Sequence, residues 1–163
     1  LLSLGDAPGV ERRKIGPVMI RGTEGMAVQF AQCCRPIPGD PIIGLISKGQ
    51  GMVIHTHDCP VIAKTRADPD KVIDVEWASE TNKLFNVNIR LVVQNQRGVL
   101  AKVAAAIAGA ESNIDNVTVD PDKGDQYATM HFTLQVFNRL HLAQIIRTLR
   151  RVPEVMRIAR VNN

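Results

Sequence analysis

Three cysteines and two histidines lie close together in this 163-residue sequence, and their types and spacing are suited to metal binding. Cys33 and Cys34 are adjacent, and Cys59 ends the segment HTHDC, which also holds His55 and His57. Structural zinc takes four nitrogen or sulfur ligands in a tetrahedron. The spacing therefore predicts a Cys₃His zinc set of Cys33, Cys34, His55 and Cys59, with His57 as a rival ligand.

Other interpretations of these residues stay open at this stage. Free cysteines are often buried without binding a ligand, and a histidine on a strand is often merely exposed. A catalytic zinc keeps one open position, whereas a set with three thiolates favours a closed structural site. Adjacent side chains of a regular strand point to opposite faces. The backbone must therefore bend near the cysteine pair, and we expect RPIPGD at 35–40 to provide the bend.

The remaining composition limits the class of protein. The sequence begins LLSLGD without an initiator methionine, so we interpret it as part of a longer protein. An odd number of cysteines argues against a secreted disulfide framework and favours the cytoplasm. No apolar run is long enough for a membrane span, and no secretory signal precedes the first strand-like segment.

Hydrophobic periodicity predicts that residues 84–163 form a strand, a helix, two strands, a helix and a strand. Apolar residues alternate within the predicted strands and recur at helical spacing within the predicted helices. The expected strands are 84–93, 112–119, 127–137 and 156–161, and the expected helices are 99–110 and 139–152. This βαββαβ order is the ferredoxin-like arrangement, in which both helices cover one face of a four-stranded antiparallel sheet.

Residues 1–80 are less regular and predict a small, strand-rich α+β module. Short strand-like runs occur at 18–22, 27–32, 40–47, 51–56 and 71–77, and a short helix fits within 59–70. A module of this size buries a limited core, so a bound metal would add useful stability. We expect the boundary between the two modules, 1–80 and 81–163, to lie in the polar segment 78–83. The whole chain is therefore of the α+β class.

The charge is uneven along the chain, which carries a formal net charge of +4. Residues 1–80 contain nine Lys/Arg and ten Asp/Glu, whereas residues 81–163 contain eleven and six. Arg147, Arg150 and Arg151 cluster at the end of the second predicted helix of that basic half. Such a cluster fits RNA contact, and it equally fits the negative end of a helix.

The segment CCRPIPGDPIIGLISKGQGMVIHTHDC, 33–59, resembles the conserved-cysteine domain of long RelA/SpoT homologues, also called the zinc-finger or ribosome-intersubunit domain. The βαββαβ unit with NQRGVLAKVAAAIA at its first turn resembles their C-terminal ACT domain. The resemblance implies the C-terminal regulatory part of a bifunctional, SpoT-like (p)ppGpp synthetase/hydrolase. Both activities, and the manganese of the hydrolase, belong to an N-terminal catalytic half that is absent here. The family's proposed metal ligands match the Cys₃His set.

The ACT resemblance also implies a ligand site and a partner. ACT domains bind small amino acids at a dimer interface, and their first turn usually reads D-x-x-G-x-L. Gly98 and Leu100 match this pattern, but Asn95 replaces the aspartate and lacks the charge that would pair with an ammonium group. Asn113 and Ile114 are where the ligand is commonly closed over by the partner chain. We predict a branched-chain amino acid there, with a turn-shaping or helix-capping role for Asn95 as the alternative.

The leading functional prediction is a regulatory and sensing module rather than a catalyst. It would contact the ribosome or tRNA, or an amino acid, and bias the catalytic half between synthesis and hydrolysis of the alarmone. A homodimerisation module without a small-molecule ligand is the second hypothesis. A metalloenzyme that uses zinc to activate water is the third, and the three thiolates of the Cys₃His set argue against it.

Overall fold

The computed structural model describes residues 18–20, 27–47, 49, 51–65, 69–77, 83–121 and 124–162, which fall into two compact units. The second unit comprises residues 84–163 together with Ile37–Gly39, and the first comprises the rest. Residues 78–82 of the expected boundary segment lie outside the described residues. Among the described residues, no helix is long and apolar enough to cross a membrane.

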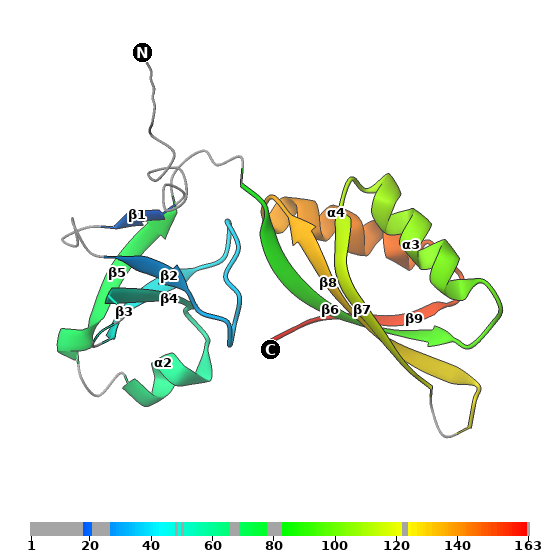
Figure 1. Ribbon diagram of the computed structural model, residues 1–163, viewed down its shortest axis with the longest axis horizontal. Coiled ribbons are helices and arrows are strands. Elements are labelled where there is room, and N and C mark those ends of the chain that lie inside the picture. The colour runs from blue at the N-terminus through cyan, green and yellow to red at the C-terminus, as the bar shows by residue number, and fades with distance from the viewer. Residues whose placement is uncertain are drawn as a thin grey trace, which may run out of the picture. The chain divides into compact units, whose positions relative to one another are not determined.

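The second unit is the expected βαββαβ arrangement. Its sheet has the order β7-β8-β6-β9, and every neighbouring pair is antiparallel. Both helices lie on the same face of this sheet (Figure 1). The α+β class and the ferredoxin-like fold are therefore confirmed. The elements are β6 (Phe85–Gln94), α3 (Val99–Gly109), β7 (Asn113–Pro121), β8 (Tyr127–Val136), α4 (Arg139–Arg150) and β9 (Val155–Val161).

The core of the second unit follows directly from the sequence pattern. Buried and less buried residues alternate along the two central strands, β6 and β8. Because successive strand residues point to opposite faces, one face of the sheet is apolar and meets the helices. The buried residues of the helices are Val99, Val103 and Ile107 on α3, and His141, Leu142, Ile145 and Leu149 on α4.

The two helices begin in different ways. Asn138 precedes α4, and its side chain accepts a hydrogen bond from the backbone N–H of His141, which is an ordinary N-cap. Gly98 precedes α3 in the left-handed region, with φ 82°, and makes no side-chain cap. α4 ends at Arg150, two residues before Val152, whose position ahead of Pro153 disfavours helical backbone.

The first unit is a five-stranded sheet with the order β1-β5-β3-β4-β2. β2 runs parallel to β4, and the other neighbours are antiparallel, including the predicted hairpin of β3 and β4. Phe30 and Trp77 stack with ring centroids 5.6 Å apart. The elements are β1 (Val18–Ile20), β2 (Val28–Phe30), β3 (Ile42–Ser47), β4 (Gly51–Thr56), α2 (Pro60–Thr65), a 3₁₀ turn (Pro69–Lys71) and β5 (Val72–Trp77).

Candidate metal centre and ligand sites

The two adjacent cysteines lie in a tight turn that follows β2. The N–H of Ala31 still donates to the carbonyl of Ile54 on β4, and the N–H of Arg35 then donates back to the carbonyl of Ala31, at 3.1 Å. Arg35 has φ 43°, in the left-handed region. We expected the bend within RPIPGD at 35–40. A bend is present, but its position was predicted wrongly. The turn falls on the cysteines themselves and ends at Arg35, so the prolines lie beyond it.

The other two members of the set come from β4 and the turn after it. His55 is the penultimate residue of β4, and the N–H of Cys59 donates to the carbonyl of Thr56. Cys59 immediately precedes α2, and the N–H of Ile62 donates to its carbonyl. Cys34, His55 and Cys59 are buried and Cys33 is half-buried. The pairing of β2 with β4 therefore brings together residues more than twenty positions apart.

The distances between the ligand atoms match a tetrahedral metal site. Four bonds to zinc, of roughly 2.3 Å to sulfur and 2.0 Å to nitrogen, place two sulfurs about 3.8 Å apart and a sulfur and a nitrogen about 3.5 Å apart. All four candidate atoms lie within 4.8 Å of one another. The individual distances are Cys33 Sγ–His55 Nδ1 3.4 Å, Cys34 Sγ–His55 Nδ1 3.7 Å, Cys33 Sγ–Cys59 Sγ 3.6 Å and Cys33 Sγ–Cys34 Sγ 3.9 Å.

Burial keeps Cys33, Cys34 and His55 neutral in the absence of a cation. Burial, together with the neighbouring Cys59 and Cys34, raises the pKa of Cys33 to about 12. Burial also raises the pKa of Cys34, although the Thr56 backbone N–H, 3.3 Å from its sulfur, opposes the shift. Burial lowers the pKa of His55, so its ring stays uncharged and able to bind a metal. A metal ion would supply the positive charge that three thiolates need.

His57, the rival ligand, lies outside this cluster. Its side chain is exposed, as is that of Asp58. Sequence spacing alone could not separate His55 from His57. The structure separates them because β4 ends at Thr56 and the chain then turns.

Asn95, the residue that departs from the ACT pattern, shapes the turn between β6 and α3. Its side-chain N–H donates to the carbonyl of Asp125 at 3.2 Å, and its backbone N–H donates to the carbonyl of Gln126 at 2.9 Å. An aspartate could not donate the first of these bonds. These bonds fit the alternative in which Asn95 shapes the turn, and the N-cap of α3, Gly98, makes no side-chain cap. The space beside Gly98 is open, and Leu100 is exposed.

Asn113 and Ile114 do not lie beside this turn. Asn113 pairs with Gln135 near the start of β7, whereas the Asn95 turn follows Gln94, which pairs with Tyr127 at the other end of β8. Tyr127 and Gln135 are eight positions apart along the strand, which is roughly 27 Å. One chain therefore does not bring the five predicted ligand-binding residues together. Ile114 is half-buried and packs against the core.

The three predicted RNA-contacting arginines are exposed at the end of α4. Arg147 and Arg150 lie in the last helical turn, and Arg151 follows it. Positive charge at this position complements the negative end of the helix, with or without RNA.

Sequence reasoning passed over an ion pair between α3 and the start of β9. Lys102 Nζ contacts Glu154 Oε2, and the Glu154 side chain is only 9% exposed. Nothing in the spacing of these two residues, 52 positions apart, signals that they meet.

Comparisons with known proteins agree with the two units. The family "RelA/SpoT RIS domain" matches residues 18–78, and the family "ACT domain" matches residues 81–160. The chain carries a RelA/SpoT RIS domain followed by an ACT domain. It is similar to the C-terminal region of the bifunctional (p)ppGpp synthase/hydrolase SpoT of Escherichia coli (strain K12), with 39% identity over 148 residues. That alignment covers 91% of this chain and 21% of the relative.

Two further similarities involve proteins described as GTP pyrophosphokinases. The one from Streptomyces coelicolor is 31% identical over 146 residues, which is 90% of this chain and 17% of the relative. The crystal structure of the ACT domain from the Chlorobium tepidum protein has a TM-score of 0.42 and 23% identity, and covers 48% of this chain and 99% of that structure. The chain thus spans about a fifth of the length of the curated relatives it matches.

Proposed function

We propose that this chain is a regulatory region that controls the (p)ppGpp synthetase and hydrolase activities of a catalytic region elsewhere in its parent protein. The order of a RIS domain and an ACT domain carries this proposal, together with the alignment to SpoT over 91% of the chain. We place the domain boundary at 80/81 and expect a cytoplasmic protein of the stringent response. On this proposal the chain itself has no catalytic role.

A chimera tests the proposal directly. The matching region of Escherichia coli SpoT is replaced by this chain, and the rates of (p)ppGpp synthesis and hydrolysis are measured. We expect both activities, with a ratio that differs from that of SpoT truncated before the region. A chimera whose two rates equal those of the truncated enzyme would show that the chain does not regulate.

For the metal centre we propose a structural zinc ion bound by Cys33, Cys34, His55 and Cys59. The four ligand atoms have near-tetrahedral spacing, and three sulfurs with one nitrogen are a donor set that zinc prefers. Cys34→Ser should lower the zinc content from about one ion per chain and unfold the first unit. His57→Asn is the matched control and should retain the metal. Equal zinc contents in both variants would exclude this ligand set.

For the ACT domain we propose a branched-chain amino acid bound between two chains. Asn95, Gly98 and Leu100 lie at one end of the sheet and Asn113 and Ile114 at the other. In an antiparallel pairing of two β7 edge strands, the start of one strand lies beside the end of the other. The Asn113 of one chain would then approach the Asn95 turn of its partner. A homodimer would thereby complete the site.

Calorimetric titration with valine and isoleucine tests this site, with glycine and aspartate as controls. We expect saturable heat for the two branched amino acids only, and its loss in Gly98→Val. Heat for none of them in a dimeric protein would favour the second candidate, a dimerisation module without a ligand. The specific observation that supports that alternative is the bond from Asn95 to Asp125, which fits a turn-shaping role for Asn95.

Contact with the ribosome or tRNA through Arg147, Arg150 and Arg151 is the last part of the proposal. All three side chains are exposed and carry no acidic neighbour in the last turn of α4. If they contact phosphates, binding of the chain to ribosomes should weaken steeply with salt, and the triple Arg→Gln variant should have a salt slope smaller by about three. An unchanged slope in the variant would exclude these arginines.

A further inference from the structure

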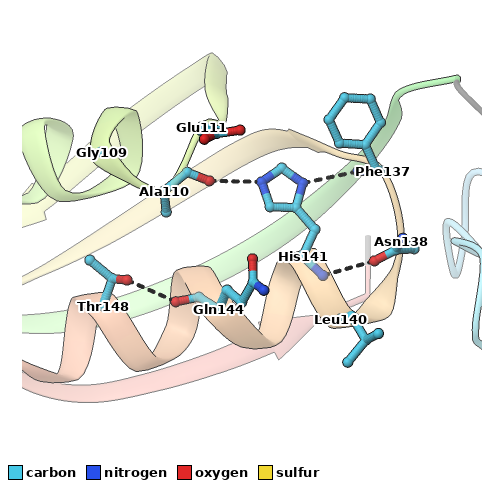
Figure 2. Close-up of a pocket in the computed structure, with 9 residues that line it drawn as sticks. All are labelled: Gly109, Ala110, Glu111, Phe137, Asn138, Leu140, His141, Gln144 and Thr148. Carbon is cyan, nitrogen blue, oxygen red and sulfur yellow. Dashed lines mark hydrogen bonds between the residues drawn. The ribbon is translucent and has the colours of Figure 1, made fainter.

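A cavity lies between the end of α3 and α4 (Figure 2). The Asn95 turn precedes the other end of α3. Its volume is about 530 Å³, within the range typical of small-molecule sites. Gly109, Ala110 and Glu111 line it at the end of α3 and just beyond, and the other residues come from the segment before α4 and from α4 itself. Those residues are Phe137, Asn138, Leu140, His141, Gln144 and Thr148. None of these residues belongs to the metal centre, the amino-acid site or the arginine cluster proposed above.

Glu111 is held at the edge of the cavity in an unfavourable backbone conformation. Its φ is 62°, in the left-handed region, where helices usually place glycine after their last turn. The N–H of Glu111 donates to the carbonyl of Ala108 and that of Ser112 to Ile107, so the α3 end is fully formed around it. A residue other than glycine is strained at such a position, and this strain points to a function for its side chain. Within the described parts of the chain, the Glu111 carboxylate makes no ion pair.

The other polar groups of the cavity do not offset this negative charge. His141 Nδ1 accepts the Phe137 N–H at 3.1 Å, so in the neutral ring Nε2 carries the proton and donates to the Ala110 carbonyl at 2.8 Å. Figure 2 shows both bonds, and no lysine or arginine is among the lining residues. The carbonyl end of α3 and the N-terminal end of α4 both line the cavity, and their opposite partial charges offset each other. Glu111 is therefore the only charged side chain of the lining, and it is suited to pairing with a cation.

The remaining walls favour a cation that carries an apolar chain. Phe137 stacks on His141 with centroids 5.4 Å apart, yet 39% of Phe137 stays exposed. Leu140 is 74% exposed. An aromatic ring beside an ammonium group adds a cation–π attraction, and the Gln144 and Thr148 side chains supply oxygen acceptors.

We propose that this cavity binds a small alkylamine, that is, a primary ammonium group on a short apolar chain without a carboxylate. Glu111 pairs with the ammonium group, and Phe137 and Leu140 contact the chain. An amino acid fits less well, because the lining holds no lysine or arginine to pair with its carboxylate beside Glu111. The lining residues differ from those of the amino-acid site proposed above, although Glu111 lies two positions before Asn113, and neither proposal depends on the other.

The test is a titration of the ¹⁵N-labelled chain with 3-methylbutylamine, followed by amide NMR. We expect saturable shifts at Ala110, Glu111 and Gln144, with a Kd on the order of 1 mM for so small a ligand. Glu111→Gln should weaken binding about fivefold, the effect of one exposed ion pair. Asp115→Asn removes an exposed carboxylate elsewhere in the same unit and should leave the Kd unchanged.

Two matched compounds separate the contribution of the ammonium charge to binding from that of the apolar chain. 3-Methylbutan-1-ol has the same chain without charge, and leucine adds a carboxylate to the amine. Both should bind at least fivefold more weakly than the amine. The proposal is overturned if the alcohol or leucine shifts the same amides with the affinity of the amine, if Glu111→Gln binds as the parent chain does, or if the amine causes no shifts.

Discussion

Cys33 and Cys34 must lose their protons before they bind a metal ion, and their burial makes this loss difficult. The pKa of Cys33 is raised to about 12 and that of Cys34 is also raised, so near neutral pH both sulfurs carry protons that zinc must displace. The lowered pKa of His55 means that its ring is already neutral there. Metal binding should therefore strengthen as pH rises through the neutral range.

The expected slope follows from the number of thiols. For each thiol that loses its proton on binding, log Kd falls by one further unit per pH unit. Three cysteines therefore give a slope of magnitude up to about three in a plot of log Kd against pH. Competition for zinc with a coloured chelator, between about pH 6 and pH 8, measures it. A pH-independent Kd would show that the cysteines are not bound as thiolates.

A second prediction concerns the backbone strain at Glu111. A side chain in the left-handed region costs about 1–2 kcal/mol, whereas glycine adds about 0.5–1 kcal/mol of unfolded-state entropy. Glu111→Gly should therefore raise the free energy of unfolding by roughly 0.5–1 kcal/mol. Glu111→Ala keeps the strained conformation and should bring no such gain. Thermal denaturation of the two variants compares them, and equal melting temperatures would mean that Glu111 is unstrained.

Among the elements, the link between α3 and β9 depends on the ion pair of Lys102 and Glu154. The hydrogen bond from Lys102 lowers the pKa of Glu154 below its usual value of 4.5. A carboxyl whose pKa is lowered by folding stabilises the fold above its unfolded pKa, and this stabilisation is lost as pH falls through the folded pKa. Glu154→Gln should therefore destabilise the protein at pH 7.

The same variant should match the parent chain once Glu154 is protonated. Urea denaturation at pH 7 and at successively lower values, starting from pH 4.5, should show the difference between the two proteins shrinking steadily. Asp115→Asn, at an exposed carboxylate with no ion pair among the described residues, serves as the control. A difference that is constant with pH would assign the loss to packing instead.

The elements themselves were largely predictable, because their patterns are local. Alternation along 127–137 and helical spacing along 139–152 predicted β8 and α4, and the structure has Tyr127–Val136 and Arg139–Arg150. The bend at the cysteine pair was misplaced because proline and glycine are the usual turn signals, whereas the turn here ends at Arg35 with positive φ. No sequence signal distinguishes such a residue in advance.

The sites, like the elements, divide into those that the sequence predicts and those that it does not. The Cys₃His set was predictable because its residue types are chemically distinctive and the hairpin between them is short. The cavity beside Glu111 was not, since its lining comes from α4 and from segments next to two helices, and none of its residue types is unusual. The bond from Asn95 to Asp125 depends on how a turn folds back, which spacing does not encode.

For the molecule as a whole, β7 is the element on which oligomeric state should depend. It is an edge strand of nine residues, almost all exposed, and Val119 is 43% exposed. Within the part of the chain that the structure describes, no strand pairs with its outer edge, and an edge of this length is suited to pairing with a second chain. Such pairing would also unite Asn95 with the Asn113 of the partner, which one chain cannot do.

Val119→Lys should therefore weaken dimerisation and amino-acid binding together. Two-fold symmetry repeats each lost cross-strand contact, so a cost of about 1–2 kcal/mol, or roughly a tenfold rise in the dimer Kd, is expected. Met156→Lys places the same charge on the other edge strand, β9, and should change neither property. Sedimentation gives the dimer Kd and calorimetry the affinity for valine. If Val119→Lys is monomeric yet binds valine as before, the site belongs to one chain and the two-chain arrangement is excluded.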